Sequence, residues 1–370
     1  MNIIVPEKRT YFDKNKKEKT INCNPYDMKV LRLLLKGNEP EWMNIKCPSH
    51  LVDQAIKEAC TAFKSNVEKI KKIHIPFDLK YKIAKNKIQT IKIDSTFMSK
   101  NKNTLFGGYT VDKKKVFSKI RSDKPFYIHG QKMTNLIWNK VLDVWKLCIP
   151  INERRKNVNK KYNIASIDPG VRDFNVVYSN NHICKLGSNT SPKLMKICKE
   201  IDIIKSRIDR KQYYTKNKDG TYNEYIVNSK RKKNLQKALH RKIAKIKNMV
   251  KNLHYKIANY LCKNYKCIIL PHFETQKMVG SSYLSSNIAR KMYTLSFYQF
   301  KTRLIHKANI FKTKILKKSE AYTSKTCTNC GNIKNNLGSN KVYNCSKCNI
   351  IIDRDFNGAR NILLKNFDYI

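Results

Sequence analysis

Acidic residues are scarce in this sequence of 370 residues, which carries 27 Asp plus Glu against 77 Lys plus Arg and a formal net charge of +50. A soluble protein that repels itself this strongly needs a polyanion to neutralise it, and nucleic acid is the usual one. Each phosphate that is neutralised releases counterions, so we expect binding to weaken steeply with salt. An anionic membrane surface is the alternative partner.

Long hydrophobic runs are absent as well. No stretch of 18 apolar residues occurs, which excludes a hydrophobic membrane-spanning helix. The chain opens on MNIIVPE at residues 1–7, and this start lacks the features of a secretory leader. These absences favour nucleic acid over a membrane as the partner.

A disulfide pattern is missing too. Eight of the 12 cysteines are scattered along the chain without a pairing pattern. Such cysteines are typical of free thiols in apolar surroundings, and free thiols persist in reducing compartments. The sequence therefore predicts an intracellular protein. The eight residues are Cys23, Cys47, Cys60, Cys148, Cys184, Cys198, Cys262 and Cys267.

The other four cysteines do have a pattern. Cys327, Cys330, Cys345 and Cys348 form two C-x2-C pairs separated by 14 residues. This spacing is typical of a zinc ribbon, in which four thiolates bind one ion tetrahedrally. Because four thiolates leave no open position for water, we expect a structural zinc ion that orders residues 321–352 and performs no chemistry.

The N-terminal part, residues 1–160, is predicted to be a lobe that binds nucleic acid. Residues 27–72 follow a helical pattern, with a second helix beginning near Ser49, a residue suited to an N-cap. Short alternating segments then dominate between about 75 and 150, for example at residues 89–93. These patterns predict an antiparallel sheet or β-barrel that carries a helical insertion.

The C-terminal part, residues 161–370, begins with strands. An apolar strand at 163–170 contains Asp168 near its end, and two short strands follow at 174–178 and 183–186. A strand that carries an acid and leads into a hairpin is typical of the start of an RNase H-type sheet.

Helices and further strands then alternate. A pair of long helices at 190–262 precedes a buried strand at 267–270, a strand at 311–316 leads to the cysteines, and a last helix is predicted at 355–364. This order predicts an α/β fold with a mixed sheet. Between the two later strands lies a helix with one apolar face formed by Ile288, Met292, Leu295 and Tyr298.

Two acids occupy the positions at which an RNase H-like sheet presents carboxylates to divalent ions. Asp168 ends the first strand, and Asp355 begins the last helix. Mg²⁺ prefers carboxylate oxygens and water, and a pair of such ions activates a water molecule and neutralises the leaving oxygen of a phosphodiester. Each acid also has a structural interpretation, as a turn residue for Asp168 and as a helix N-cap for Asp355. Their joint placement around a zinc ribbon favours the catalytic interpretation.

Three stretches resemble motifs of TnpB-type nucleases. SIDPGVR at 166–172 resembles their first RuvC motif, YTSKTC at 322–327 with the second cysteine pair resembles their zinc ribbon, and DRDFNGARNI at 353–362 resembles their third RuvC motif. The resemblance covers roughly residues 160–370. It is closest to the Fanzor proteins, the eukaryotic and viral relatives of TnpB.

This resemblance implies an RNase H-like (RuvC) nuclease domain with an inserted zinc ribbon. It further implies an endonuclease that uses two Mg²⁺ ions, is guided by an RNA encoded by its own transposable element, and cuts double-stranded DNA beside a short flanking motif. We expect a monomeric ribonucleoprotein, located in the nucleus if the host is eukaryotic. The alternatives are a guide-independent RNase H-like nuclease or resolvase, and an inactive zinc-ribbon protein that binds nucleic acid.

The second catalytic carboxylate departs from the family pattern. Most relatives place it directly after the buried strand, where this chain has Pro271, which cannot bind a metal. The candidates are Glu274, three residues on, and Glu320, at the end of the neighbouring strand. In the Fanzor-like branch the glutamate is relocated to a place like that of Glu320. The expected Mg²⁺ ligands are therefore Asp168, Glu320 and Asp355, with Glu274 as the alternative to Glu320.

Basic residues gather on the second long helix, at Arg231-Lys232-Lys233 and Arg241-Lys242. A solvated helix face is one interpretation. In a chain this basic, the helix pair also suits the backbone of an RNA–DNA duplex, whose shape is read without sequence. The run SKRKK at 229–233 also resembles a nuclear localisation signal.

Overall fold

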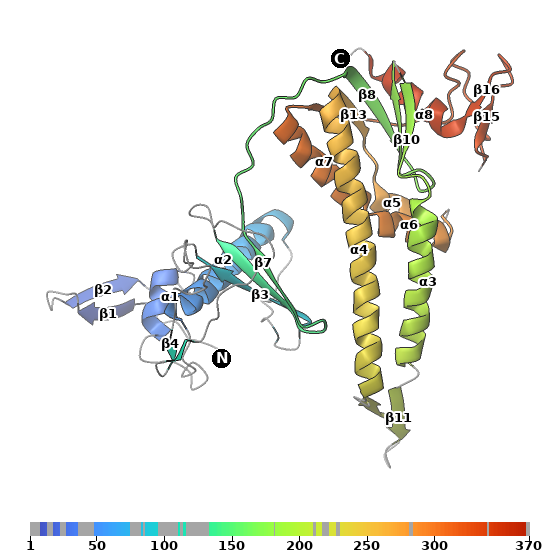
Figure 1. The fold of residues 1–370 in the computed structure, drawn as a ribbon. Helices are drawn as coiled ribbons and strands as arrows, with labels where there is room; N and C mark the ends of the chain where they lie inside the picture. Colours follow the sequence, from blue (N-terminus) through green and yellow to red (C-terminus); the bar gives the residue numbers. More distant parts are fainter. Residues whose placement is uncertain are drawn as a thin grey trace. The chain divides into compact units, whose positions relative to one another are not determined.

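The chain divides into two compact units, residues 1–152 and 153–370, each considered by itself (Figure 1). The computed structural model describes residues 8–12, 18–22, 27–35, 48–74, 83, 86–94, 110–111, 114–115, 133–180, 182–209, 212–216, 222–226, 230–280, 284–338 and 340–367. Across these ranges, no helix combines the length and apolar character needed to cross a membrane.

The first unit contains a three-stranded antiparallel sheet with β6 (Thr134–Asn139) between β3 (Ile88–Ile93) and β7 (Val144–Cys148). Trp138 of β6 and Trp145 of β7 are cross-strand partners, and their rings stack with centroids 5.3 Å apart. Such pairs stabilise a hairpin through the contact between side chains on one face.

Two helices accompany this sheet. α1 (Met28–Leu35) contacts α2 (Ser49–Ile73), and α2 contacts β3. Within the predicted helical segment 27–72, helices occur at 28–35 and 49–73, and residues 36–47 lie outside the described residues; the predicted strand at 89–93 is part of β3. Ser49 is not the N-cap, because Pro48 occupies that position and provides no side-chain hydrogen bond.

Two short antiparallel ribbons complete the described part of this unit. They pair β1 (Lys8–Phe12) with β2 (Glu18–Asn22), and β4 (Thr110–Val111) with β5 (Lys114–Lys115). The predicted β-barrel includes residues 95–109 and 116–132, which lie outside the described residues, so the barrel stays a prediction.

The second unit is built on a five-stranded mixed sheet in the order β10-β9-β8-β13-β14. β8 (Tyr162–Pro169), β9 (Asn175–Ser179) and β10 (His182–Leu186) form an antiparallel meander, whereas β13 (Tyr265–Pro271) and β14 (Lys314–Lys318) run parallel to β8. The predicted mixed α/β fold is confirmed. The strand predicted at 311–316 is β14, which begins at Lys314 because the preceding helix continues to Phe311.

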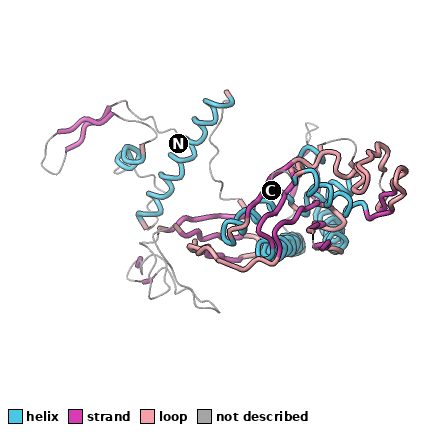
Figure 2. The backbone as a smooth tube through the Cα atoms, turned by 90° about the horizontal axis from the view of Figure 1, so that it is seen from above, coloured by secondary structure: helices cyan, strands magenta, loops and turns pink. Residues whose placement is uncertain are grey.

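Helices cover both faces of this sheet, whose strands lie side by side between them (Figure 2). Ala165, Ile167 and Ile268 pack into the main core with α4 (Lys230–Asn264) and α7 (Phe297–Phe311). The alternate residues Ile164 and Ile269 pack instead against α8 (Arg354–Lys365). This alternation follows from the two-residue period of a strand.

α3 (Thr190–Asp209) and α4 form the predicted long hairpin, which Figure 1 shows as two helices side by side. Between them the structure adds β11 (Gln212–Lys216) and β12 (Tyr222–Ile226), an antiparallel ribbon that the polar sequence did not predict. The predicted polar tip at 217–220 lies outside the described residues.

The helix predicted to run through Ile288 and Tyr298 is in fact two helices. α6 (Ser286–Leu295) ends and α7 begins at Ser296, whose backbone φ of 52° lies in the left-handed region. Because the helix axis changes there, Tyr298 does not share the buried face and is 76% exposed. A short helix, α5 (Thr275–Val279), precedes this pair.

Candidate metal-binding active site

Three acidic side chains come from neighbouring strand ends and from α8. Asp168 lies near the end of β8 and shares strand parity with Ile164 and Ser166, which face α8. The pairing of Ser166 with Ile269 and of Pro271 with Lys318 defines the register of three parallel strands. Continuing that register sets Asp168 level with Pro271, and Glu320 lies two residues beyond Lys318.

The remaining acid, Asp355, is in the first turn of α8, which packs over β8 and β9. The helix lies very close to the strand at this point. The Ser166 hydroxyl donates a hydrogen bond to the Ala359 carbonyl over 2.6 Å, and a Cβ atom on Gly358 would lie 2.8 Å from Oδ2 of Asp168. A side chain at position 358 would therefore collide with the carboxylate, which explains why a glycine stands there.

The electrostatics of Asp168 indicate that the other two acids lie near enough to repel its charge. Burial, followed by repulsion from Asp355 and Glu320, raises the pKa of Asp168 to about 8, and Arg354 opposes this rise. Burial raises the pKa of Glu320 to about 7. For Asp355, burial and the neighbouring Asp353 raise the pKa.

More basic side chains act on Asp355 than on Asp168. Arg172, Arg354 and Lys185 each lower the pKa of Asp355. Of these, only Arg354 is among the charges that act on Asp168. The protein thus gathers three carboxylates with too little positive charge to ionise them all, which is the environment that a divalent cation would complete. Oxygen ligands of this kind fit Mg²⁺.

Glu274, the alternative to Glu320, lies elsewhere. It is exposed, stands at the N-cap position of α5, and is not among the charges that act on Asp168. Pro271 ends β13 and pairs with Lys318 of β14. Glu320 is thus among the charges that raise the pKa of Asp168, and Glu274 is not.

Asp353 caps the N-terminus of α8, the structural role that the sequence analysis gave as the alternative for Asp355. Its side chain accepts hydrogen bonds from the backbone N–H groups of Asp355 and Phe356, so Asp353 is the N-cap of α8. It also pairs with Lys185 over 2.7 Å. The N-cap interpretation of Asp355 is therefore wrong, and its carboxylate is not used to cap the helix.

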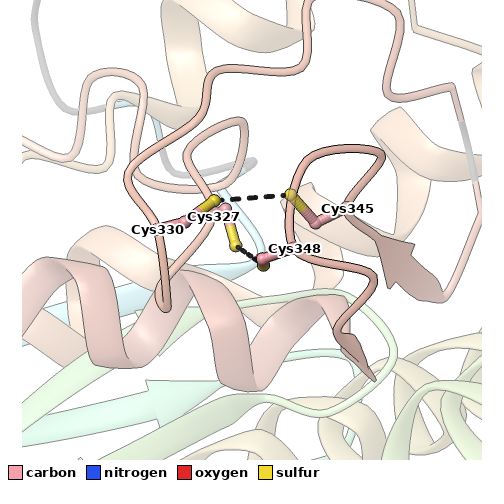
Figure 3. A group of neighbouring side chains, drawn as sticks. All are labelled: Cys327, Cys330, Cys345 and Cys348. Carbon is pink, nitrogen blue, oxygen red and sulfur yellow. Dashed lines mark hydrogen bonds between the residues drawn. The ribbon is translucent and has the colours of Figure 1, made fainter.

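The four cysteines of the ribbon converge on one point, as Figure 3 shows. Their sulfur atoms all lie within 4.8 Å of one another, and Cys327–Cys348 and Cys330–Cys345 are each separated by 3.6 Å. These separations are too long for disulfide bonds, which span about 2.05 Å. They match the edge of about 3.8 Å expected for a tetrahedron with zinc–sulfur bonds of about 2.3 Å.

The backbone around the ribbon also favours thiolates. The N–H group of Cys348, followed by that of Lys347, points at the sulfur of Cys345 and lowers its pKa to about 6. A short antiparallel pair, β15 (Val342–Asn344) and β16 (Ile351–Asp353), joins the second cysteine pair to α8. These observations fit a zinc ion held by the four cysteines.

Two buried asparagines tie the ribbon to the acidic cluster. Asn357 donates to the Thr326 carbonyl over 2.8 Å and accepts from the Thr328 N–H over 2.9 Å. Asn361 donates to the carbonyls of Thr323 and Thr326. Thr323 in turn donates its hydroxyl to the Glu320 carbonyl over 2.7 Å. Both asparagines lie in the motif at 353–362, but the sequence alone indicated no role for them.

The chain is similar to several known proteins. The family model "Cas12f1-like, TNB domain" matches residues 297–362, which include Glu320, the four cysteines and Asp355. A TnpB-like protein of Acanthamoeba polyphaga mimivirus is 31% identical over 351 residues, which are 92% of this chain and 62% of the relative. This chain is similar to that TnpB-like protein over most of its own length. It spans about 62% of the length of that relative.

Two further relatives are more distant. The putative RNA-guided DNA endonuclease InsQ of Escherichia coli strain K12 is 29% identical over 178 residues, which are 39% of this chain and 44% of that protein. A solved Cas12f1–sgRNA–target DNA complex has a TM-score of 0.43 at 17% identity, covering 62% of this chain and 44% of that chain. A score this low does not by itself establish a common fold.

The asparagine contacts lead to a stability prediction. We expect Asn357→Ala to lower the free energy of unfolding by about 1–3 kcal/mol, because the Thr328 N–H and the Thr326 carbonyl lose a buried partner. Asn336→Ala, at an exposed position of the same ribbon, is the control and should change it by less than about 0.5 kcal/mol. Denaturant unfolding measures the free energy of unfolding of both variants. Equal losses in the two variants would show that the hydrogen bonds of Asn357 do not stabilise the fold.

The raised pKa of Asp168 predicts a pH dependence. Between its ordinary pKa of 3.8 and its folded value of about 8, the folded chain holds a proton that the unfolded chain has lost. Stability without divalent ions therefore falls as pH rises through this window. Asp168→Asn should raise the melting temperature, and the gain should grow from pH 5 to about pH 8. Differential scanning calorimetry in the presence of a chelator measures the melting temperatures. Asp209→Asn, on the exposed end of α3, is the control, and its effect on the melting temperature should not grow with pH.

Proposed function

We propose that the second unit is an RNase H-like (RuvC) nuclease domain that hydrolyses phosphodiester bonds in DNA with two Mg²⁺ ions. The observation that carries this proposal is that Asp355 and Glu320 both raise the pKa of the buried Asp168 at the end of β8. The sheet order supports it, because an antiparallel meander followed by two parallel strands is the arrangement expected for this fold.

Each acid has a distinct task in this scheme. A bound pair of divalent ions supplies an activated water and neutralises the leaving oxygen. Asp168, whose pKa is raised most, is the acid that depends most on a cation to stay ionised. Asp355 is kept closer to its charged form by Arg172 and Arg354. Glu320 replaces the carboxylate that Pro271 does not provide.

The four cysteines are proposed to hold a structural zinc ion in an inserted ribbon. Through Asn357 and Asn361 the ribbon fixes α8, and through Thr323 it fixes the turn that carries Glu320. The ion would therefore position two of the three acids without contacting the substrate. It has no open position of its own for chemistry.

A guide RNA is the proposed source of target choice. The E. coli relative is described as RNA-guided, and the net charge of +50 here suits a nucleic-acid complex. We propose a monomeric ribonucleoprotein with an RNA from its own transposable element, which cuts double-stranded DNA next to a short motif and acts in the nucleus of a eukaryotic host. Residues 1–160 would hold guide and target, as in the Fanzor branch.

The basic hairpin is proposed to follow the backbone of the guide–target duplex. Arg231, Lys233 and Arg241 on α4 are exposed and available for phosphates. Lys242 is not equivalent to them, because it forms an ion pair with Glu200 of α3. That pair holds the two helices together, so the sequence interpretation of Arg241 and Lys242 as one basic site needs this correction.

Co-purified RNA tests guidance directly. Protein from cells that express its own locus should carry a discrete RNA that ends at the element boundary, and this complex should cut matched double-stranded DNA when Mg²⁺ is added. Sequencing of the RNA and a plasmid cleavage assay measure this. Cutting without RNA would point to a guide-independent nuclease, and random RNA with no cutting would point to an inactive binding protein.

The choice between the two glutamates has its own test. We expect Glu320→Gln to lower the cleavage rate roughly a hundredfold or more, because a ligand of an ion that supplies several kcal/mol is lost. Glu274→Gln is the matched control and should retain cleavage within about threefold, because Glu274 does not act on Asp168. The cleavage rates of both variants are measured in single-turnover experiments with the RNA-loaded complex. A larger loss of rate in Glu274→Gln than in Glu320→Gln would make Glu274 the metal ligand.

A further inference from the structure

The edge strand β10 places a lysine in the same row of the sheet as the first acid. Asp168 of β8 is paired with Val176 of β9, and Val176 is paired with Lys185 of β10. Residues that lie directly opposite one another on neighbouring strands point to the same face of a sheet. Lys185 therefore lies on the α8 face with Asp168, two strand spacings of about 4.8 Å away. The proposed hydrolysis has no role for this lysine.

The ammonium group of Lys185 binds the start of α8 in two ways. Its Nζ atom lies 2.7 Å from Oδ2 of Asp353, the N-cap, and 4.8 Å from the centre of the Phe356 ring. A cation at this distance from the face of an aromatic ring is attracted to it. Asp355 lies between these two contacts in the sequence. The first turn of α8 is thus held on both sides of Asp355.

Both carboxylate oxygens of Asp353 have partners. Oδ1 accepts hydrogen bonds from the N–H groups of Asp355 and Phe356 over 2.9 and 3.3 Å. Oδ2 accepts a hydrogen bond from Lys185. Asp353 is a fourth acid whose charge acts on Asp355. Because a cation already engages the oxygen that the cap does not use, a divalent ion is disfavoured at Asp353.

A weaker contact joins the same lysine to the turn after β8. Nζ of Lys185 lies 3.7 Å from Oδ2 of Asp173. That turn is tight, because a Cβ atom on Gly170 would lie 2.8 Å from the Asp173 carbonyl oxygen, and it directly follows the strand that carries Asp168. The side chains of Lys185 and Asp173 are 34% and 16% exposed. Salt therefore screens this contact less than it screens a pair on an open surface.

We propose that Lys185 is a positioning residue that fixes the first turn of α8, and with it Asp355, against the strand that carries Asp168. By engaging Asp353 it also keeps the fourth acid out of the metal site. The inference rests on the proposed function, because it assigns a supporting residue to the same site. Lys185 contacts neither the ions nor the substrate.

Binding of Mn²⁺ to the full-length chain, freed of RNA, tests this role without cleavage. Lys185→Met keeps a long side chain and removes its charge. Groups that orient metal ligands contribute about 10–100-fold to metal affinity, so this variant should bind Mn²⁺ at least about tenfold more weakly. Lys185→Arg keeps the charge and should stay within about threefold of the parent. Electron paramagnetic resonance of free Mn²⁺ measures the affinity.

The direction of the change separates positioning from charge alone. A lysine that acted only through its charge would repel a divalent ion, so its removal would strengthen Mn²⁺ binding. A purely structural lysine would lower the melting temperature in chelator and leave the affinity unchanged. Lys314→Met, at the exposed start of the other edge strand, is the matched control and should bind Mn²⁺ as the parent does.

The partner of the lysine provides a second test. Asp353→Asn keeps an oxygen for the cap and removes the charge that binds Lys185. If Lys185 acts through Asp353, the double variant should lose less affinity than the product of the two single losses, because both changes break one contact. Losses that simply multiply would contradict this coupling and overturn the proposal.

Asp168→Asn identifies the binding that belongs to the site, since only the Mn²⁺ lost in this variant is counted. Unchanged or stronger site binding in Lys185→Met would overturn the positioning role and leave the proposed function intact. If the parent shows no binding that depends on Asp168, the proposed metal site fails, and the positioning role fails with it.

Discussion

The structure of the second unit depends on hydrogen bonds from two buried amides on one helix. Asn357 and Asn361 of α8 satisfy backbone groups of Thr323, Thr326 and Thr328 at the entrance to the cysteine ribbon. Because the same helix carries Asp355 and the same turn follows Glu320, these bonds fix the position of two acids relative to each other. An unmatched buried amide or carbonyl costs about 1–3 kcal/mol, so the arrangement has little freedom to relax.

The acids themselves oppose this arrangement. Burial raises the pKa values of both Asp168 and Glu320, and repulsion from Asp355 and Glu320 adds to the rise at Asp168. The sheet register, the close approach of Gly358 and the ribbon contacts hold them together nonetheless. A divalent cation held by these acids would offset that cost, which is why we propose a metal site here.

Much of this could be predicted from the sequence, and the misses have identifiable causes. Metal-ligand spacing is local, so the four cysteines were recognisable, and Asp168 and Asp355 followed from motifs. The break at Ser296 was missed because a left-handed serine leaves no mark in a hydrophobic pattern. An N-cap role stayed open for Asp355 because Asp353 and Asp355 are both acids at a helix start, and only the contacts of Asp353 distinguish them.

The most direct test of this account is diffraction from crystals soaked in Mn²⁺, with anomalous scattering used to locate the ions. The account predicts two peaks at the edge of the sheet, with carboxylate oxygens of Asp168, Glu320 and Asp355 at the distances of direct ligands. Peaks that are bound by Glu274 in place of Glu320, or the absence of any peak near Asp168, would contradict it.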